Sequence, residues 1–322
     1  MGLNLNKKKI QVSVIGAGYM AEEHIKAFKK FKRFKILGII SKNNLNAKKL
    51  ASKYKINYVC KSIDELYLKT FAKLLIIAVP ETEVKKVMFK SLNYPWKILS
   101  EKPLGLNFTE SKQIFLQSKK LKKDKNIVVG FNRRNYNTTK YILSDIHKSK
   151  KRLVQIFDQQ NIYDYRVVGL PNKIKKNWMF ANSTHLIDFA NIFCRGNIIK
   201  INKKLSNLEK NSHIIFFSAK YDSGDILIYN ALWNVPGPWS ITVSNQDKSY
   251  KLEPLEALKI KEKNSRKYKL VKLKKIDEKF KIKFGLYNQT KELLRFCDNK
   301  KNYLCSVKDS HKTMNLTKKI YS

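Results

Sequence analysis

The fold of this chain is decided by the stretch Val12-Ser13-Val14-Ile15-Gly16-Ala17-Gly18-Tyr19-Met20-Ala21. A β-rich run ends there in the pattern G-x-G-x-x-A, and a helical pattern follows. Gly16 permits a tight turn, Gly18 lets the backbone approach a phosphate closely, and Ala21 is small enough for close helix–strand packing. Unpaired N–H groups at the helix start favour an anion there. The stretch therefore predicts a phosphate-binding turn; the alternative is a simple glycine turn in an α/β domain.

The sequence on either side of this stretch alternates between short apolar runs and amphipathic runs. The run 74–79 is apolar at every position, which is typical of a parallel strand buried on both faces by helices. Strict alternation of strand and helix predicts a doubly wound parallel sheet of the Rossmann type. The main predicted strands cover residues 10–15, 34–40, 74–79, 97–100 and 127–131.

The pattern changes after about Phe131. Residues 198–273 consist of successive strand-like runs with turns at Ser223-Gly224 and Pro236-Gly237-Pro238, and helical patterns flank them. We therefore expect an α/β chain with a dinucleotide-binding Rossmann domain at residues 1–130 and an α+β domain with a largely antiparallel sheet at residues 131–322.

The net charge is +42, from 67 Lys and Arg against 25 Asp and Glu. Only eight of the basic residues are Arg, and the chain is also rich in Asn and Ile, as AT-rich codons would make it. A protein that reads DNA bases more often uses Arg for bidentate contacts. We expect a solvated basic surface and no specific nucleic-acid partner; the alternative is a nucleic-acid or acidic-membrane binder.

The cysteines and histidines show no metal-ligand spacing, so we expect no metal site. Free thiols in a reducing compartment are the expected state of the four cysteines. The apolar runs are too short to span a bilayer, and no secretory signal is apparent at the start. We expect a soluble cytoplasmic protein without a membrane partner. The cysteines are Cys60, Cys194, Cys297 and Cys305.

The residues after the second predicted strand bear on the choice of cofactor. An acidic residue there normally binds the ribose 2′-hydroxyl of NAD. This chain has Ser41 and Lys42 instead, and the Lys42 ammonium could pair with a 2′-phosphate. We expect NADP or NAD as the cofactor, with NADP favoured; the alternative is that Lys42 is one of many solvated lysines.

Three further segments complete a resemblance. They are Glu101-Lys102-Pro103-Leu104-Gly105, Gly130-Phe131-Asn132-Arg133-Arg134 and His185-Leu186-Ile187-Asp188. With the opening glycine motif they resemble the Gfo/Idh/MocA family, named for glucose–fructose oxidoreductase and inositol dehydrogenase, over nearly the whole chain. The resemblance implies that the second domain has an open, mostly antiparallel sheet, binds substrate, and forms a homo-oligomer, a dimer or tetramer, through that sheet.

The resemblance also implies an activity. An NAD(P)-dependent oxidoreductase would transfer a hydride between the nicotinamide and a hydroxyl carbon of a sugar, sugar acid or nucleotide sugar. Lys102 would hydrogen-bond the reacting hydroxyl and His185 would take or return its proton, roles that suit an ammonium and an imidazole. Alternatively, Lys102 is a surface lysine and His185 a helix histidine bonded to a neighbour. The expected cofactor-binding residues are Gly16, Gly18, Tyr19, Met20, Ser41, Lys42, Pro80, Glu101 and Lys102.

One position departs from the family pattern. Many members carry an Asp four residues before the histidine, where this chain has Ala181. Asn182, on the same helical face as His185, could orient substrate. Asp188 could hold the imidazole tautomer, and could equally cap or pack a helix. The missing acid supports the alternative of a catalytically impaired nucleotide-binding or regulatory member.

Arg133 and Arg134 stand out in a chain with so few arginines. A guanidinium at the end of a Rossmann strand can bind a carboxylate or phosphate of the substrate. The resemblance associates an N-R-R group at this place with surface-glycan or nucleotide-sugar metabolism; the alternative is an inter-domain salt bridge. Trp178 could stack on a sugar ring, or belong to the core.

Overall fold

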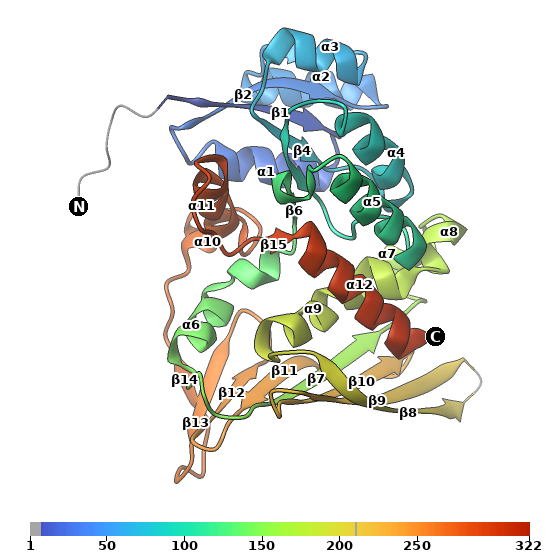
Figure 1. The fold of residues 1–322 in the computed structure, drawn as a ribbon, viewed down its shortest axis with the longest axis vertical. Helices are drawn as coiled ribbons and strands as arrows, with labels where there is room; N and C mark the ends of the chain where they lie inside the picture. Colours follow the sequence, from blue (N-terminus) through green and yellow to red (C-terminus); the bar gives the residue numbers. More distant parts are fainter. Residues whose placement is uncertain (1–7, 210) are drawn as a thin grey trace. The chain divides into compact units, whose positions relative to one another are not determined.

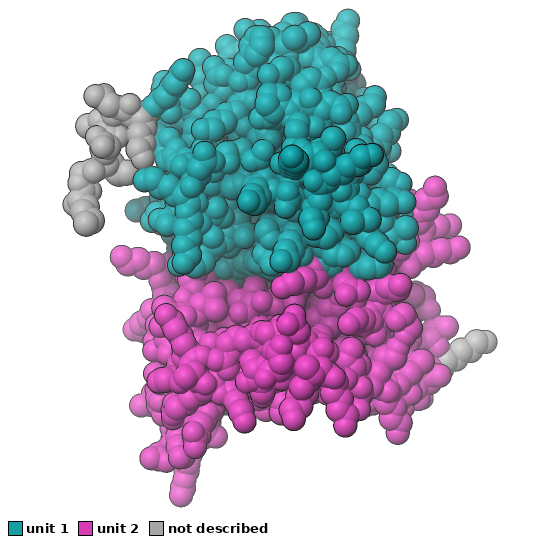
Figure 2. Space-filling view, viewed as in Figure 1, with its two compact units in different colours: residues 1–135, 275–311 teal, residues 136–274, 312–322 magenta. Residues whose placement is uncertain are grey.

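The computed structural model describes residues 8–209 and 211–322. The chain divides into two compact units, coloured separately in Figure 2: residues 1–135 with 275–311, and residues 136–274 with 312–322. The division at residue 130 predicted from sequence is linear, whereas these units are discontinuous. The difference arises because segment 275–311 supplies two helices and an edge strand to the first unit.

The first unit is built on a seven-stranded sheet in the order β15-β6-β5-β4-β1-β2-β3. Strands β1 to β6 are parallel to their neighbours, and β15 adds an antiparallel edge to β6. This is the Rossmann strand order, with its reversal between β1 and β4, so the predicted fold is confirmed. The strands are β1 (Ile10–Ile15), β2 (Phe34–Ile40), β3 (Tyr58–Val59), β4 (Leu74–Ile77), β5 (Lys97–Ser100), β6 (Ile127–Val129) and β15 (Cys305–Ser306).

The helices of the first unit cover both faces of this sheet, and every residue of β4 is buried as a result. Three of them begin with an Asn or Ser cap whose side chain accepts a backbone N–H of the first turn. The helices are α1 (Tyr19–Phe28), α2 (Asn44–Tyr54), α3 (Ile63–Thr70), α4 (Glu81–Ser91), α5 (Phe108–Lys120), α10 (Ile276–Lys279) and α11 (Leu286–Cys297), with 3-10 turns η1 (Asp124–Asn126) and η2 (Asn132–Asn135).

The second unit contains an open eight-stranded sheet in the order β14-β13-β12-β11-β7-β10-β9-β8. Only the β7–β10 pair is parallel; the other pairs are antiparallel, as predicted. The strands are β7 (Leu153–Gln160), β8 (Ile198–Glu209), β9 (Ser212–Tyr221), β10 (Ile226–Trp233), β11 (Trp239–Ser244), β12 (Lys248–Leu252), β13 (Leu258–Glu262) and β14 (Lys269–Val271).

Helices α6 (Asn137–Asp145) and α9 (Thr184–Phe193) lie over one face of this sheet (Figure 1). Alternate residues of β7 point into the core beneath them. A π-helical turn, Met179–Ser183, leads directly into α9. The remaining helices are α7 (Tyr165–Val168), α8 (Asn172–Lys175) and α12 (Val307–Tyr321), and the second boundary between units falls inside α12.

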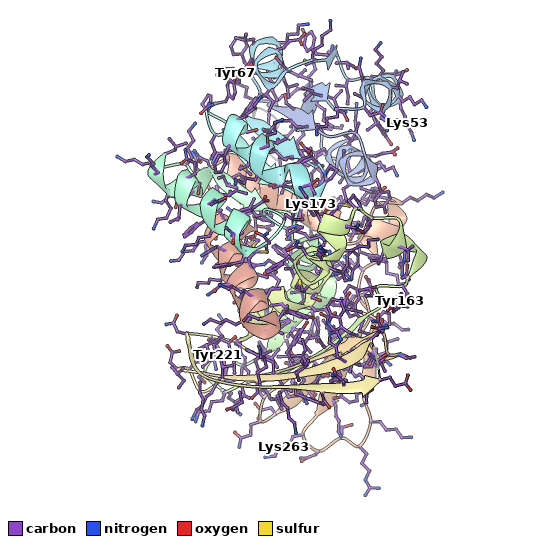
Figure 3. The ribbon with its side chains drawn as sticks, turned by 90° about the vertical axis from the view of Figure 1, so that its right-hand side faces the viewer. Lys53, Tyr67, Tyr163, Lys173, Tyr221 and Lys263 are labelled. Carbon is purple, nitrogen blue, oxygen red and sulfur yellow. The ribbon has the colours of Figure 1, made fainter. Side chains whose placement is uncertain are left out.

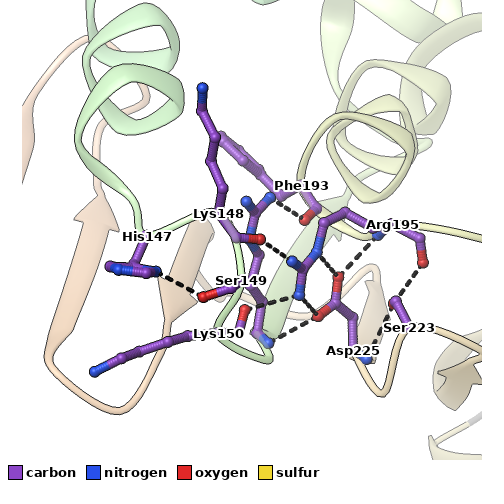
Figure 4. A network of polar contacts seen from close by, with 9 residues as sticks. His147, Lys148, Ser149, Lys150, Phe193, Arg195, Ser223 and Asp225 are labelled. Carbon is purple, nitrogen blue, oxygen red and sulfur yellow. Dashed lines mark hydrogen bonds and ion pairs between the residues drawn. The ribbon is translucent and has the colours of Figure 1, made fainter.

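A buried carboxylate joins three segments of the second unit (Figure 4). Asp225, fully buried just before β10, accepts hydrogen bonds from the backbone N–H groups of Arg152 and Arg195 at 2.9 Å. The Arg195 guanidinium adds two more at 2.9 and 2.7 Å. Burial opposes ionisation, yet these hydrogen bonds hold the pKa of Asp225 below its ordinary value. The carboxylate therefore fixes the start of β7, the end of α9 and the turn before β10.

Basic residues are spread over both units. Lys53 in α2, Lys173 in α8 and Lys263 after β13 are all exposed (Figure 3). None of the described helices is long and apolar enough to cross a membrane.

Candidate functional site

The two glycines of the opening motif have different structural surroundings. Gly16 has φ +113°, and a Cβ built on it would lie 2.0 Å from the carbonyl oxygen of Ala78. Gly18 is the N-cap of α1, and a Cβ built there meets nothing within 4 Å. No side chain caps this helix end. The fold therefore requires glycine at position 16, whereas Gly18 leaves open space at a helix N-terminus, which fits a dinucleotide pyrophosphate.

The segment after β5 is tied to α1 by a buried pair. His24 Nε2 donates a hydrogen bond of 2.6 Å to Glu101 Oε1, and both side chains are buried. Burial opposes the charge of Glu101, but the His24 hydrogen bond and the positive charges of Lys102 and Lys283 bring its pKa below the ordinary value. A carboxylate thus lies next to Lys102 in the chain.

Lys102 is the titratable group of this unit whose environment best suits chemistry. Burial lowers the pKa of its ammonium to about 8, although Glu101 and Glu81 favour the charged form and Arg133 and Lys283 oppose it. An amine with a pKa this close to neutrality can both donate and accept a proton under physiological conditions.

The remaining predicted cofactor residues line up along the ends of β1, β2 and β4. Tyr19 is largely exposed, and Met20 follows it in the first turn of α1. Pro80 is the exposed N-cap of α4, and Ser41 directly follows β2. Lys42 is exposed and its Nζ lies 2.7 Å from Glu83 Oε1 of α4. The carboxyl ends of parallel strands meet at one sheet edge, where doubly wound folds bind their ligands.

The N-R-R group begins the turn η2. Asn132 donates a hydrogen bond of 2.7 Å to the carbonyl of Phe284, which lies in the segment 275–311 of the first unit. Arg134 Nη1 lies 3.8 Å from Asp309 Oδ2, so Arg134 has an acidic neighbour within its own unit. Arg133 contributes positive charge near both Lys102 and Lys283.

In the second unit, Gln160 joins two of the predicted substrate residues. Its Oε1 accepts hydrogen bonds from Trp178 Nε1 at 2.8 Å and from Asn182 Nδ2 at 2.9 Å. Gln160 is buried, while Trp178 and Asn182 are half-buried. Asn182 lies in the π-helical turn before α9, a local geometry that is frequent at functional sites.

Gln160 also contacts a buried acid, Asp158. Asp158 accepts hydrogen bonds from Gln160 Nε2 and the Tyr229 hydroxyl, and from Trp239 Nε1 at 2.8 Å. Burial raises the pKa of Asp158, while these donors oppose that rise. Because a carboxylate only accepts, the Gln160 amide must turn its nitrogen toward Asp158 and its oxygen toward Asn182. The Asn182 nitrogen then faces Gln160, and its oxygen is directed away from it.

His185 is buried in the first turn of α9, four residues after the buried Ala181. Asp188 is also buried, and its Oδ1 accepts a hydrogen bond of 2.7 Å from Thr313 Oγ1 of α12. Asp188 therefore has at least one structural partner.

Three residues that contact or act on the predicted site residues were not predicted from the sequence. They are Asp158, Gln160 and Lys283. The first two end a strand with alternating burial, and that alternation is the signal that places both on its inner face. Lys283 carried no signal, because it stands in a run rich in lysine.

Residues 10–131 match the Gfo/Idh/MocA family model, described as an oxidoreductase family with an NAD-binding Rossmann fold. No curated protein sequence matches the chain.

Solved structures with the same fold cover almost all of the chain. One is UDP-N-acetylglucosamine 3-dehydrogenase GnnA from Acidithiobacillus ferrooxidans, with TM-score 0.76 and 14% identity over 98% of this chain and 97% of that chain. Another is the dehydrogenase MviM from Clostridium difficile, with TM-score 0.76 and 18% identity over 98% and 99%. A third is levoglucosan dehydrogenase in complex with NADH and L-sorbose, with TM-score 0.77 and 17% identity over 98% and 96%. At these identities the likeness shows the fold.

Proposed function

We propose, on the premise that this chain belongs to the Gfo/Idh/MocA family of NAD-binding oxidoreductases, that it transfers a hydride between a nicotinamide and a hydroxyl carbon of a sugar, sugar acid or nucleotide sugar. The observation that carries this proposal is Lys102. Its pKa is lowered to about 8 in the same unit as the open glycine turn at Gly18. A buried lysine with this pKa is better suited to hydrogen-bond a reacting hydroxyl than a solvated surface lysine is.

A bound nicotinamide supplies or accepts the hydride. In the proposed mechanism the Lys102 ammonium donates a hydrogen bond to the reacting oxygen and stabilises the negative charge that develops there. His185 takes the hydroxyl proton during oxidation and returns it during reduction. The Gly16–Ala21 turn holds the pyrophosphate at the start of α1, with Gly18 leaving it room. Tyr19, Met20, Ser41, Lys42, Pro80 and Glu101 complete the proposed cofactor-binding residues.

The proposed substrate class is sugar-like. Asn182 presents an amide oxygen fixed through Gln160, and Trp178 offers an aromatic face, a pairing that suits hydroxyl groups on a ring. The names of similar proteins support this class: GnnA is a dehydrogenase of UDP-N-acetylglucosamine, and levoglucosan dehydrogenase was solved with L-sorbose. Arg133, Arg134 and Asp188 are the further proposed substrate residues, and an anionic group on the substrate would suit the arginines.

We further propose that NADP is preferred over NAD. Lys42 is exposed at the end of β2 and no acidic residue stands at that position. Its ion pair with Glu83 competes with a 2′-phosphate, so Glu83→Gln should tighten NADPH binding and Lys42→Glu should weaken it. Dissociation constants for NADPH and NADH, from quenching of protein fluorescence, test this. Native protein that binds NADH at least as tightly as NADPH contradicts the preference.

The proposed homo-oligomer forms through the second unit's sheet. Phe216 of β9 and Ile226 of β10 lie on the same face of the sheet, and each is 44% exposed. A sheet face that exposes large apolar side chains is suited to contact with a second copy of the chain. Sedimentation of native protein and of Phe216→Lys tests the proposal: a native protein that is monomeric at all concentrations contradicts it.

A second candidate function is a nucleotide-binding member with impaired catalysis. Ala181 favours it, since the family acid is missing four residues before His185. Hydride transfer separates the two candidates. NADPH and NADH deuterated at C4 are incubated with keto-sugars and keto-forms of nucleotide sugars, and deuterium in the products is measured by mass spectrometry. We expect transfer to at least one class. Tight dinucleotide binding with no deuterium transferred to any of these keto compounds would favour the impaired member.

A further inference from the structure

We propose that Lys283, from the segment that returns to the first unit, is a further cofactor-binding residue whose ammonium pairs with the dinucleotide pyrophosphate. This inference rests on the proposed function, and it adds a cation that the glycine motif does not contain.

The position of the Lys283 side chain is set by the start of α1. Its Nζ lies 3.2 Å from Met20 Sδ and 5.6 Å from the centroid of the Tyr19 ring. Both residues belong to the first turn of α1, directly after Gly18. The ammonium is therefore located at the helix end whose unpaired N–H groups already favour an anion.

The backbone around Lys283 is held from both sides. Its N–H donates a hydrogen bond of 2.7 Å to Glu23 Oε2 of α1, and Glu23 is buried. The carbonyl of the next residue, Phe284, accepts from Asn132 at 2.7 Å. The Asp277 carboxylate accepts hydrogen bonds from the backbone N–H groups of Gly285 and Tyr287, each with an N···O distance of 3.0 Å. These bonds close the turn into α11. Because this backbone is already fixed, binding a ligand at Lys283 requires ordering of the side chain alone.

Lys283 lies within electrostatic range of Glu101 and Glu23, which favour its charged form, and of Arg133, which opposes it. Burial lowers its pKa, and within the described part of the chain its ammonium forms no ion pair with a carboxylate. Glu23 accepts the backbone N–H of Lys283 through Oε2, and its Oε1 pairs with Lys26 Nζ at 2.6 Å. A thioether and an aromatic ring are weak partners for an ammonium. A pyrophosphate would give the Lys283 ammonium a direct ion pair.

Lys283 also acts on the neighbouring site residues. Its positive charge favours the ionised form of Glu101 and disfavours the charged form of Lys102. Lys283 therefore lies close to the start of α1 and near enough to Lys102 for its charge to act there. A phosphate bound at Lys283 would cancel this effect and leave Lys102 more easily protonated.

The test is the affinity for dinucleotides and their fragments. Kd values for NADPH, for ADP-ribose, which contains the pyrophosphate but no nicotinamide, and for adenosine, which lacks phosphate, are measured for the native protein and three variants. Lys283→Met removes the ammonium, and Lys283→Arg keeps the charge if the methionine variant folds poorly. Lys279→Met is the matched control, because Lys279 is an exposed lysine in the same segment.

We expect Lys283→Met to raise the Kd for NADPH and ADP-ribose about tenfold or more, the usual effect of losing a charge-assisted hydrogen bond. Its adenosine affinity should stay native, its salt dependence should weaken, and Lys279→Met and Lys283→Arg should bind like native protein. A native Kd in Lys283→Met, or an equal loss in Lys279→Met, overturns the inference. Native protein that binds neither NADPH nor ADP-ribose overturns the proposed function itself.

Discussion

His24 Nε2 lies 2.6 Å from Glu101 Oε1, and this buried hydrogen bond joins the helix of the glycine turn to the E-K-P segment. The helix begins at Gly18, and Glu101 precedes Lys102 in the chain. The position of the proposed phosphate site is thus coupled to that of the proposed catalytic lysine by one short contact. Because both partners are polar and buried, the contact is costly to break and fixes the geometry.

The lowered pKa of Lys102 predicts a pH dependence of turnover. Burial is the largest influence and brings the pKa to about 8, despite attraction by Glu101 and Glu81. Since the ammonium is the form that stabilises an alkoxide, kcat/KM should fall as the pH rises through about 8. Lys102→Arg stays charged, so its profile should lose this falling limb. An identical limb in the arginine variant would contradict the assignment.

Substitutions of the two motif glycines should have different effects, one on cofactor binding and the other on the stability of the fold. Gly18→Val places its side chain in open space, so the melting temperature should stay native while the Kd for NADPH rises at least about tenfold. Gly16→Ala combines φ +113° with a Cβ 2.0 Å from the Ala78 carbonyl oxygen, so it should destabilise the fold by more than the about 1–3 kcal/mol that backbone strain alone costs. Calorimetric melting and fluorescence titration of both variants test this. Gly18→Val that binds NADPH normally would refute the phosphate site.

Asp158 should influence substrate choice through Gln160 and Asn182. In Asp158→Asn the residue can donate as well as accept, so only the Trp178 N–H still orients the Gln160 amide and the Asn182 oxygen is fixed less firmly. We expect KM to rise about tenfold, the value of one hydrogen bond, with the cofactor Kd unchanged. Discrimination between the preferred sugar and its deoxy analogues should shrink.

The matched control for this experiment is Asp225→Asn. Asp225 is an equally buried acid of the second unit whose carboxylate accepts hydrogen bonds from Arg152 and Arg195, neither of them a predicted site residue. A merely structural role for Asp158 would make both variants lose stability and neither change discrimination. Unchanged discrimination in Asp158→Asn is therefore the result that rejects the positioning role.

Asp225 itself should govern acid stability. Its folded pKa is depressed by Arg195 and two backbone N–H groups, so its contribution is complete above the unfolded pKa of about 4 and disappears as the pH falls through the folded pKa. Asp225→Asn should cost about 3 kcal/mol near neutral pH, the lower end for a broken buried pair, since Arg195 is 30% exposed. Urea unfolding of both proteins near neutrality and at about pH 3 tests this. A difference that does not narrow in acid would contradict the assignment.

Much of the fold could be predicted because it depends on local pattern. The wholly apolar run 74–79 required a strand covered on both faces, and the structure buries all of β4. The return of 275–311 to the first unit could not be predicted. It depends on contacts such as Glu23 with Lys283, and on the two-residue strand β15, which is too short to give a periodic signal.

The candidate site residues could be predicted only where they belong to a recognisable sequence motif. The glycine turn and Lys102 stand in specific patterns, whereas Asp158 and Gln160 acquire their meaning from the strand alternation that turns both inward. Lys283 is distinguished from dozens of lysines only by its tertiary position beside Met20. The predicted roles of Lys102 and His185 stay predictions until kinetics test them.

The most direct test is the single-turnover rate constant of hydride transfer in native protein, Lys102→Met, His185→Ala and the double variant, with the best substrate from the screen. We expect each single variant to lose about a hundredfold to ten-thousandfold in rate, and His185→Ala to keep the native cofactor affinity. The double variant should be little slower than the slower single one, since the proposed mechanism has both groups act on one oxygen. Near-native transfer in either single variant, or losses that multiply fully, would contradict it.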